Sequence, residues 1–126
     1  MLFFDTSAAV DWLRGKEELK NQTDNDSVAI SVITVYELLR ATKRKRRSAV
    51  EAAELFIDAC TILPVTTDIA RRAAYLKTDL LAGGKDKPMA DLLIAATAEK
   101  EGLKFLTSDE DFQDIGRFAD IDFHII

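Results

Sequence analysis

Short apolar stretches that recur between longer helical stretches are the feature that most restricts the fold of this chain. Residues 2–4 and 28–32 have the length and the apolar or β-branched composition of buried strands. The stretches between the strands show the apolar spacing of helices, which is the crossover connection that parallel strands require. This alternation predicts an α/β fold with three layers, in which helices cover both faces of a central parallel sheet of four to five strands. The other strands are expected at 62–65, 104–107 and 121–126.

Residues with strong capping preferences indicate where the helices between these strands begin and end. Thr6 or Ser7 is the expected N-cap of the first helix, and Ser48 is the expected N-cap of a helix after a basic run. Pro88 opens another helix as its first-turn residue, and Gly102 caps its end. Further helices are expected at 16–21, from 34 into the basic run, from 67 to a stop at 83–84, and as a short helix or turn at 109–113.

Length and composition predict one domain that spans residues 1–126. The chain is 48% apolar and has no run long enough to cross a membrane and no secretory leader, so we expect a cytoplasmic protein without a membrane partner. Its single cysteine, Cys60, cannot close an internal disulfide and is expected to be a buried spectator.

Four acidic residues are placed where the ends of parallel strands should bring them together. Asp5 ends the first strand, and Asp109 follows the fourth. Glu37 is expected in the first turn of the helix after the second strand, and Asp91 in the first turn of the helix before the fourth. All of these positions belong to the carboxyl edge of the sheet, where open α/β sheets bind ligands. We therefore expect the four carboxylates to converge.

A cluster of carboxylates requires a cation, because the charges otherwise repel one another. Oxygen ligands alone suit Mg²⁺ or Mn²⁺, whereas one histidine and one cysteine provide no zinc site. One or two such ions can activate water and stabilise the in-line displacement of a phosphodiester. The acids therefore predict a metal-dependent hydrolase.

The same acids also have structural explanations. Glu37 lies three residues after Thr34, and Asp111 three after Ser108, which is the spacing of a capping box. Asp5 can cap the first helix about as well as it can bind a ligand. For Asp91 we favour function over a simple interaction with the helix dipole, because it shares an apolar stripe where an unpaired charge is costly.

Four sequence blocks resemble the PIN-domain nucleases, and particularly the VapC toxins of prokaryotic toxin-antitoxin pairs. Each block is a modest match alone, but their order and intervals are specific and cover nearly the whole chain. The blocks are residues 2–7, 31–38, 89–98 and 106–112.

The resemblance implies a magnesium-dependent endoribonuclease of three-layer fold, usually a homodimer, held inactive by a VapB-like antitoxin that reaches into the acidic site. It assigns Asp5, Glu37, Asp91 and Asp109 as metal ligands or as residues that orient metal-activated water. It assigns Thr6, Ser7 and Thr107 as hydroxyl partners of these acids, and leaves Asp111 as the alternative to Asp109, which ranks first.

A net charge of −5 disfavours RNA binding, but a local run of basic residues could still attract the RNA backbone. A solvated helix end is an equally good interpretation. The run consists of Lys43, Arg44, Lys45, Arg46 and Arg47. Trp12, Tyr36 and Phe112 lie beside the acidic blocks, and core packing is favoured over base stacking for all three.

Two other functions compete with RNA hydrolysis. A phospho-acceptor signalling domain needs an aspartate at the end of the third strand, where residues 63–67 offer none. A non-catalytic module that binds RNA or protein would not need all four acids. Both alternatives rank below the nuclease.

Overall fold

Five parallel strands form the central sheet of the computed structural model, which describes residues 1–126. Their order in the sheet is β3-β2-β1-β4-β5, so β1 is central and has a neighbour on each side. The predicted α/β fold with a parallel sheet is confirmed. The strands are β1 (Leu2–Phe4), β2 (Val28–Ser31), β3 (Thr61–Leu63), β4 (Lys104–Thr107) and β5 (Asp122–Ile125).

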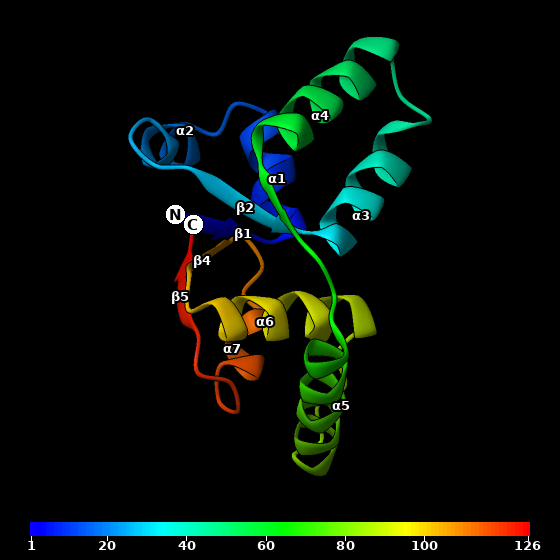
Figure 1. The fold of residues 1–126 in the computed structure, drawn as a ribbon, viewed down its shortest axis with the longest axis vertical. Coiled ribbons are helices and arrows are strands. Elements are labelled where there is room, and N and C mark those ends of the chain that lie inside the picture. The colour runs from blue at the N-terminus through cyan, green and yellow to red at the C-terminus, as the bar shows by residue number, and fades with distance from the viewer.

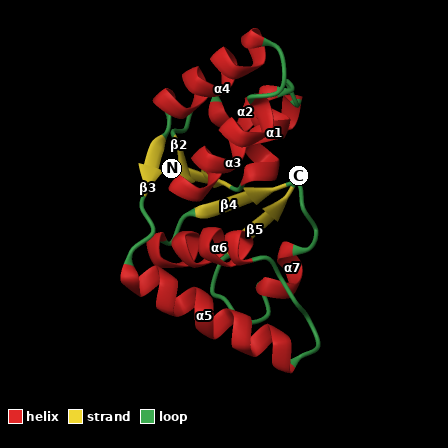
Figure 2. Cartoon of the chain, turned by 90° about the vertical axis from the view of Figure 1, so that its right-hand side faces the viewer, coloured by secondary structure: helices red, strands yellow, loops and turns green.

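Seven helices cover the two faces of this sheet and complete the three layers (Figures 1 and 2). One layer contains α1 (Thr6–Leu13), α2 (Glu17–Thr23), α3 (Val32–Thr42) and α4 (Arg47–Ala59). The other contains α5 (Thr67–Ala82), α6 (Met89–Glu101) and α7 (Phe112–Ile115). None of these helices is long and apolar enough to span a bilayer.

The alternation of side chains along the strands creates one hydrophobic core on each face. Phe3 points towards α5, α6 and α7, whereas Phe4 packs in the core under α1 to α4. The ring of Phe105 lies 5.4 Å from Phe3 and 5.1 Å from Phe112, centroid to centroid, so aromatic contacts join the sheet to α7. The carboxyl ends of the strands are thus supported from both sides.

The structure corrects several predicted helix starts. Asp5, and neither Thr6 nor Ser7, is the N-cap of α1, because its Oδ1 accepts from the backbone N–H of Ala8 at 2.8 Å. The prediction for Ser48 was wrong, since α4 begins at 47 without any side-chain cap.

The start of α3 lies two residues earlier than predicted. The hydroxyl of Ser31 accepts from the N–H of Ile33 at 3.0 Å, which caps the helix directly after β2. Pro88 likewise occupies the N-cap position of α6 and not its first turn, while Gly102 ends α6 in a left-handed conformation as predicted. The first residues of α3 and α6 determine in which helical turn Glu37 and Asp91 lie.

Two expectations about burial were wrong in part. Cys60 is half-buried, and its burial raises the pKa of the thiol to about 11, so it stays protonated near neutral pH. Phe112 is buried in the core and Trp12 is half-buried against Phe56. Tyr36, by contrast, is 65% exposed, because no element covers that face of α3.

Candidate active site

The four predicted acids all lie at the carboxyl edge of the sheet. Asp5 directly follows β1 and Asp109 follows β4. Asp91 is in the first turn of α6. Glu37 is in the second turn of α3, not the first, because the helix starts at 32.

Asp5 is held by a set of short hydrogen bonds at the centre of this edge. Its carboxylate accepts from the hydroxyl of Thr107 at 2.6 Å and from that of Ser7 at 2.8 Å, in addition to the Ala8 N–H. The side chain is only 2% exposed. Burial therefore raises the pKa of Asp5 to about 6, which the hydrogen bonds oppose and the charge of Asp109 reinforces.

Asp91 lies in the electrostatic field of all three other acids. Its pKa is raised to about 6, first by burial and then by the negative charges of Asp109, Glu37 and Asp5, in that order. Lys87 lowers the pKa and offsets only part of this effect. The charge of Asp91 is therefore repelled by each of the other three carboxylates.

A hydroxyl relay connects Glu37 to the start of α1. The hydroxyl of Thr6 donates to Glu37 Oε1 at 2.6 Å and lies 3.2 Å from the hydroxyl of the buried Thr34. Glu37 therefore bonds across to α1 and does not form a capping box with Thr34. The sequence analysis did not assign Thr34 to the site.

Asp109 and Asp111 point to different partners. The charge of Asp109 acts on Asp5 and Asp91, and its Oδ1 accepts from the N–H of Asp111 at 2.9 Å. The side chain of Asp111 is 76% exposed, and its Oδ1 lies 4.0 Å from Nζ of Lys87. This arrangement favours Asp109 as the acid that faces the other three.

A further contact beside the acids was missed by the sequence analysis. The hydroxyl of Ser108 donates to Oδ2 of Asp11 on α1 at 2.6 Å, and Lys16 lies 3.8 Å from the same carboxylate oxygen. Ser108 therefore forms no capping box with Asp111, which is itself at the N-cap position of α7. No local pattern indicates the Ser108–Asp11 pair, since its members are 97 positions apart.

The donor chemistry of the site fits a hard divalent cation. The four candidate ligands offer only carboxylate oxygens, and the repulsion at Asp91 is what a cation would relieve. As the side chains stand, no group of three or more His, Cys, Asp or Glu residues is arranged to hold an ion. The carboxylates of Asp5, Glu37 and Asp109 are instead directed at hydroxyl or amide donors, so common coordination would require them to reorient.

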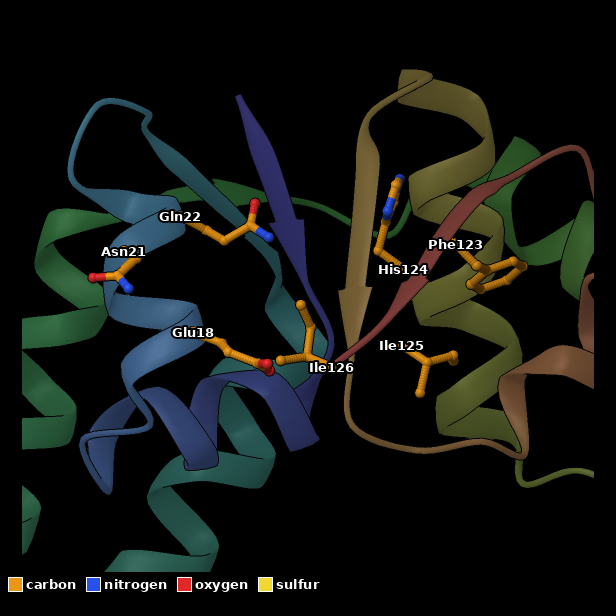
Figure 3. A pocket seen from close by; sticks show the side chains of 7 residues that line it. All are labelled: Glu18, Asn21, Gln22, Phe123, His124, Ile125 and Ile126. Atoms are coloured by element: carbon orange, nitrogen blue, oxygen red, sulfur yellow. The ribbon is translucent and has the colours of Figure 1, made fainter.

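An open pocket lies away from these acids, between α2 and β5 (Figure 3). Its volume is about 820 Å³, and none of the four acids lines it. His124 on its wall lies 3.0 Å from Asp122 on the same strand and does not contact the acidic edge. The cavity is lined by Glu18, Asn21, Gln22, Phe123, His124, Ile125 and Ile126.

The basic run lies at the tip of the hairpin formed by α3 and α4, away from the sheet (Figure 1). All five of its side chains are exposed, and the only ion pair among them joins Arg47 to Glu51 at 3.1 Å. Lys43 follows α3 about 9 Å farther along the helix axis than Glu37. The run is therefore accessible, and α3 connects it to the acidic edge.

The raised pKa of Asp91 predicts how stability depends on pH. Between about pH 4 and pH 6 the folded protein keeps a proton on Asp91 that the unfolded chain has released, so this group lowers stability as pH rises through that window. The Asp91→Asn variant should therefore gain stability relative to wild type, by about 1–2 kcal/mol at pH 7 and by nothing below about pH 4.

Urea unfolding in EDTA at a series of pH values measures this difference. Excess Mn²⁺ should remove the gain of the variant at pH 7, because a bound cation stabilises the wild-type carboxylates. A difference that stays constant from pH 4 to pH 7 would contradict the raised pKa.

A family model and a curated relative both match this chain over most of its length. The family model described as PIN domain matches residues 2–118. Ribonuclease VapC5 of Mycobacterium tuberculosis is 32% identical to this chain over 123 residues, which cover 94% of this chain and 90% of that protein.

Solved structures share the fold over the whole chain. The VapBC2 structure from Rickettsia felis, bound to a DNA fragment from its promoter, matches with a TM-score of 0.86 and 20% identity, covering 99% of this chain and 98% of that one. The VapBC-5 toxin-antitoxin structure from Mycobacterium tuberculosis matches with a TM-score of 0.76 and 25% identity over the same shares of the two chains.

Proposed function

This chain belongs to the PIN-domain family, and from that premise we propose that it is a metal-dependent endoribonuclease, the toxin of a VapBC-type toxin-antitoxin pair that acts in the cytoplasm. Its likeness to a VapC ribonuclease supports a nuclease of the hydrolase class. The observation that carries the proposal is the position of Asp91, whose carboxylate is repelled by three others at the carboxyl edge of a parallel sheet.

Asp5, Asp91 and Asp109 would hold the cation, with Glu37 beside them. Bound Mg²⁺ or Mn²⁺ would activate water and neutralise the charge that develops on the scissile phosphate. Thr107 and Ser7 keep the Asp5 carboxylate at the edge of the sheet by donating to it, and Thr6 does the same for Glu37. These bonds hold Asp5 and Glu37 at the sheet edge, and a bound cation would compete with the hydroxyl donors for their oxygens.

The basic run would bind the sugar-phosphate backbone of the RNA. Four of its five cations have no ion-pair partner within the chain, which leaves them free to contact phosphates. The hairpin position would guide a single strand along α3 towards Glu37. RNA is thus bound at one end of α3 and cleaved at the other.

We propose two protein partners, a VapB-like antitoxin and a second copy of this chain, of which the second is implied by the family resemblance alone. The matching structures are toxin-antitoxin complexes, and this supports an antitoxin for the present protein. Light scattering of the purified protein measures the dimer, and inhibition of cleavage by the co-expressed antitoxin measures the complex.

Removal of the metal tests the proposed function directly. The protein should cleave 5′-labelled RNA in millimolar Mg²⁺ or Mn²⁺, and EDTA in excess should reduce the rate by at least about 100-fold. Dialysis followed by addition of Mn²⁺ should restore the rate, which separates metal loss from denaturation. Cleavage that continues undiminished in EDTA would reject the proposal.

A further inference from the structure

The side chain of Lys87, in the loop between α5 and α6, is held by packing along its stem and by ion pairs at its ammonium group. The side chain is only 10% exposed, so its apolar stem is packed within the protein. Its Nζ lies 2.9 Å from Oδ2 of Asp114 and 4.0 Å from Oδ1 of Asp111. The ammonium therefore has one well-defined position, unlike a lysine on an open surface.

This ion pair joins two segments that carry acids of the candidate site. Lys87 lies four residues before Asp91. Asp111 follows Asp109 on the loop after β4, and Asp114 lies in α7, which that loop leads into. The Asp111 N–H also donates to the Asp109 carboxylate, which connects that side chain to the same loop.

The two segments would otherwise tend to separate. Asp109 and Asp91 are both acidic, and their like charges repel each other. The attraction between Lys87 and Asp114 acts between the same two segments in the opposite sense, and it raises the pKa of Lys87.

We propose that Lys87 is a positioning residue, which holds the Asp109 loop against the start of α6 and so sets the gap between Asp109 and Asp91 for a divalent cation. The inference rests on the proposed function in that it assumes a metal site at these acids. Lys87 needs to touch neither substrate nor metal, because it acts through the loop that carries Asp109.

If Lys87 acted on the metal site through its charge alone, its removal would have the opposite effect on metal affinity from the one that a positioning role predicts. A nearby ammonium repels a divalent cation, so its removal should strengthen metal binding if position does not matter. If Lys87 sets the gap, its removal should weaken binding even though the site becomes more negative. The direction of the change therefore separates the two roles.

Calorimetric titration with Mn²⁺ alone tests the inference without any measurement of activity. Lys87→Met keeps the apolar stem and should weaken binding by about tenfold, as is typical for residues that orient metal ligands. The double variant Lys87→Met with Asp114→Asn removes one charge of each sign, leaves the net charge unchanged, and should be as weak as the single variant. Lys87→Arg should recover much of the affinity.

Lys100→Met is the matched control, since it removes a positive charge from the exposed end of α6. It should bind Mn²⁺ within about twofold of wild type. Thermal unfolding verifies each fold, and if Lys87→Met does not fold, Lys87→Gln removes the same positive charge with a more polar side chain and should weaken binding equally.

Binding by Lys87→Met or the double variant that is as tight as wild type, or tighter, would overturn the inference. The proposed function fails separately, if the wild-type protein binds Mn²⁺ but cleaves no RNA.

Discussion

Replacement of Asp91 by asparagine should reduce RNA cleavage on the order of 1000-fold while the protein stays folded. The carboxylate of Asp91 lies near three like charges, so its negative charge destabilises the folded protein until a bound cation offsets the repulsion. Asparagine has nearly the same shape and no charge. The variant should thus lose the ligand without losing the packing of α6.

Single-turnover cleavage of labelled RNA measures this effect, and urea unfolding measures the stability of the same preparation. Asp58→Asn is the matched control, because Asp58 is an exposed aspartate on α4 and far along the chain from the acids. It should retain activity within about twofold. An Asp91→Asn preparation with nearly wild-type activity would show either that a contaminating nuclease cuts the RNA or that Asp91 is no ligand.

The sheet and its functional edge could be predicted from the sequence because both are encoded locally. Each strand is a short apolar run, and each connection has helical spacing, so the parallel topology follows from the alternation alone. Once the topology is parallel, residues after strand ends, such as Asp5 and Asp109, must share an edge. This reasoning requires no knowledge of which strands are neighbours.

Two other contacts near the acids could not be predicted, since each joins residues distant in the sequence. The Ser108–Asp11 bond and the Lys87–Asp114 pair depend on how the loop after β4 lies against α1 and α6. Periodicity also failed for Tyr36, because whether a helix face is covered depends on neighbours that the local pattern does not specify.

The start of α3 shows how a small local error moves a site residue. Thr34 and Glu37 have the spacing of a capping box, but Ser31 caps the helix first and frees Glu37 to bond with Thr6. The capping-box spacing of Thr34 does not reveal that Ser31, three residues earlier, caps the helix instead. The helix starts where it does because β2 ends at Ser31, at the edge of the sheet.

Neutralisation of the basic run should weaken RNA binding by roughly 10- to 100-fold at low salt and leave the cleavage step unchanged. The variant replaces Arg44, Lys45 and Arg46 with glutamine, all exposed and without ion-pair partners. If each contacts one phosphate of a single strand, the slope of log K against log salt should become shallower by roughly 2.

The measurement separates binding from cleavage when it is made in the Asp91→Asn background, where RNA remains intact during a fluorescence anisotropy titration. The matched control replaces three exposed cations of the opposite layer, Arg71, Lys100 and Arg117, and so changes the net charge by the same amount. Because screening limits long-range attraction to about 10 Å at 0.1 M salt, only cations near the RNA path should matter. An equal loss of affinity in both variants would mean that the net charge, and not the hairpin tip, attracts the RNA.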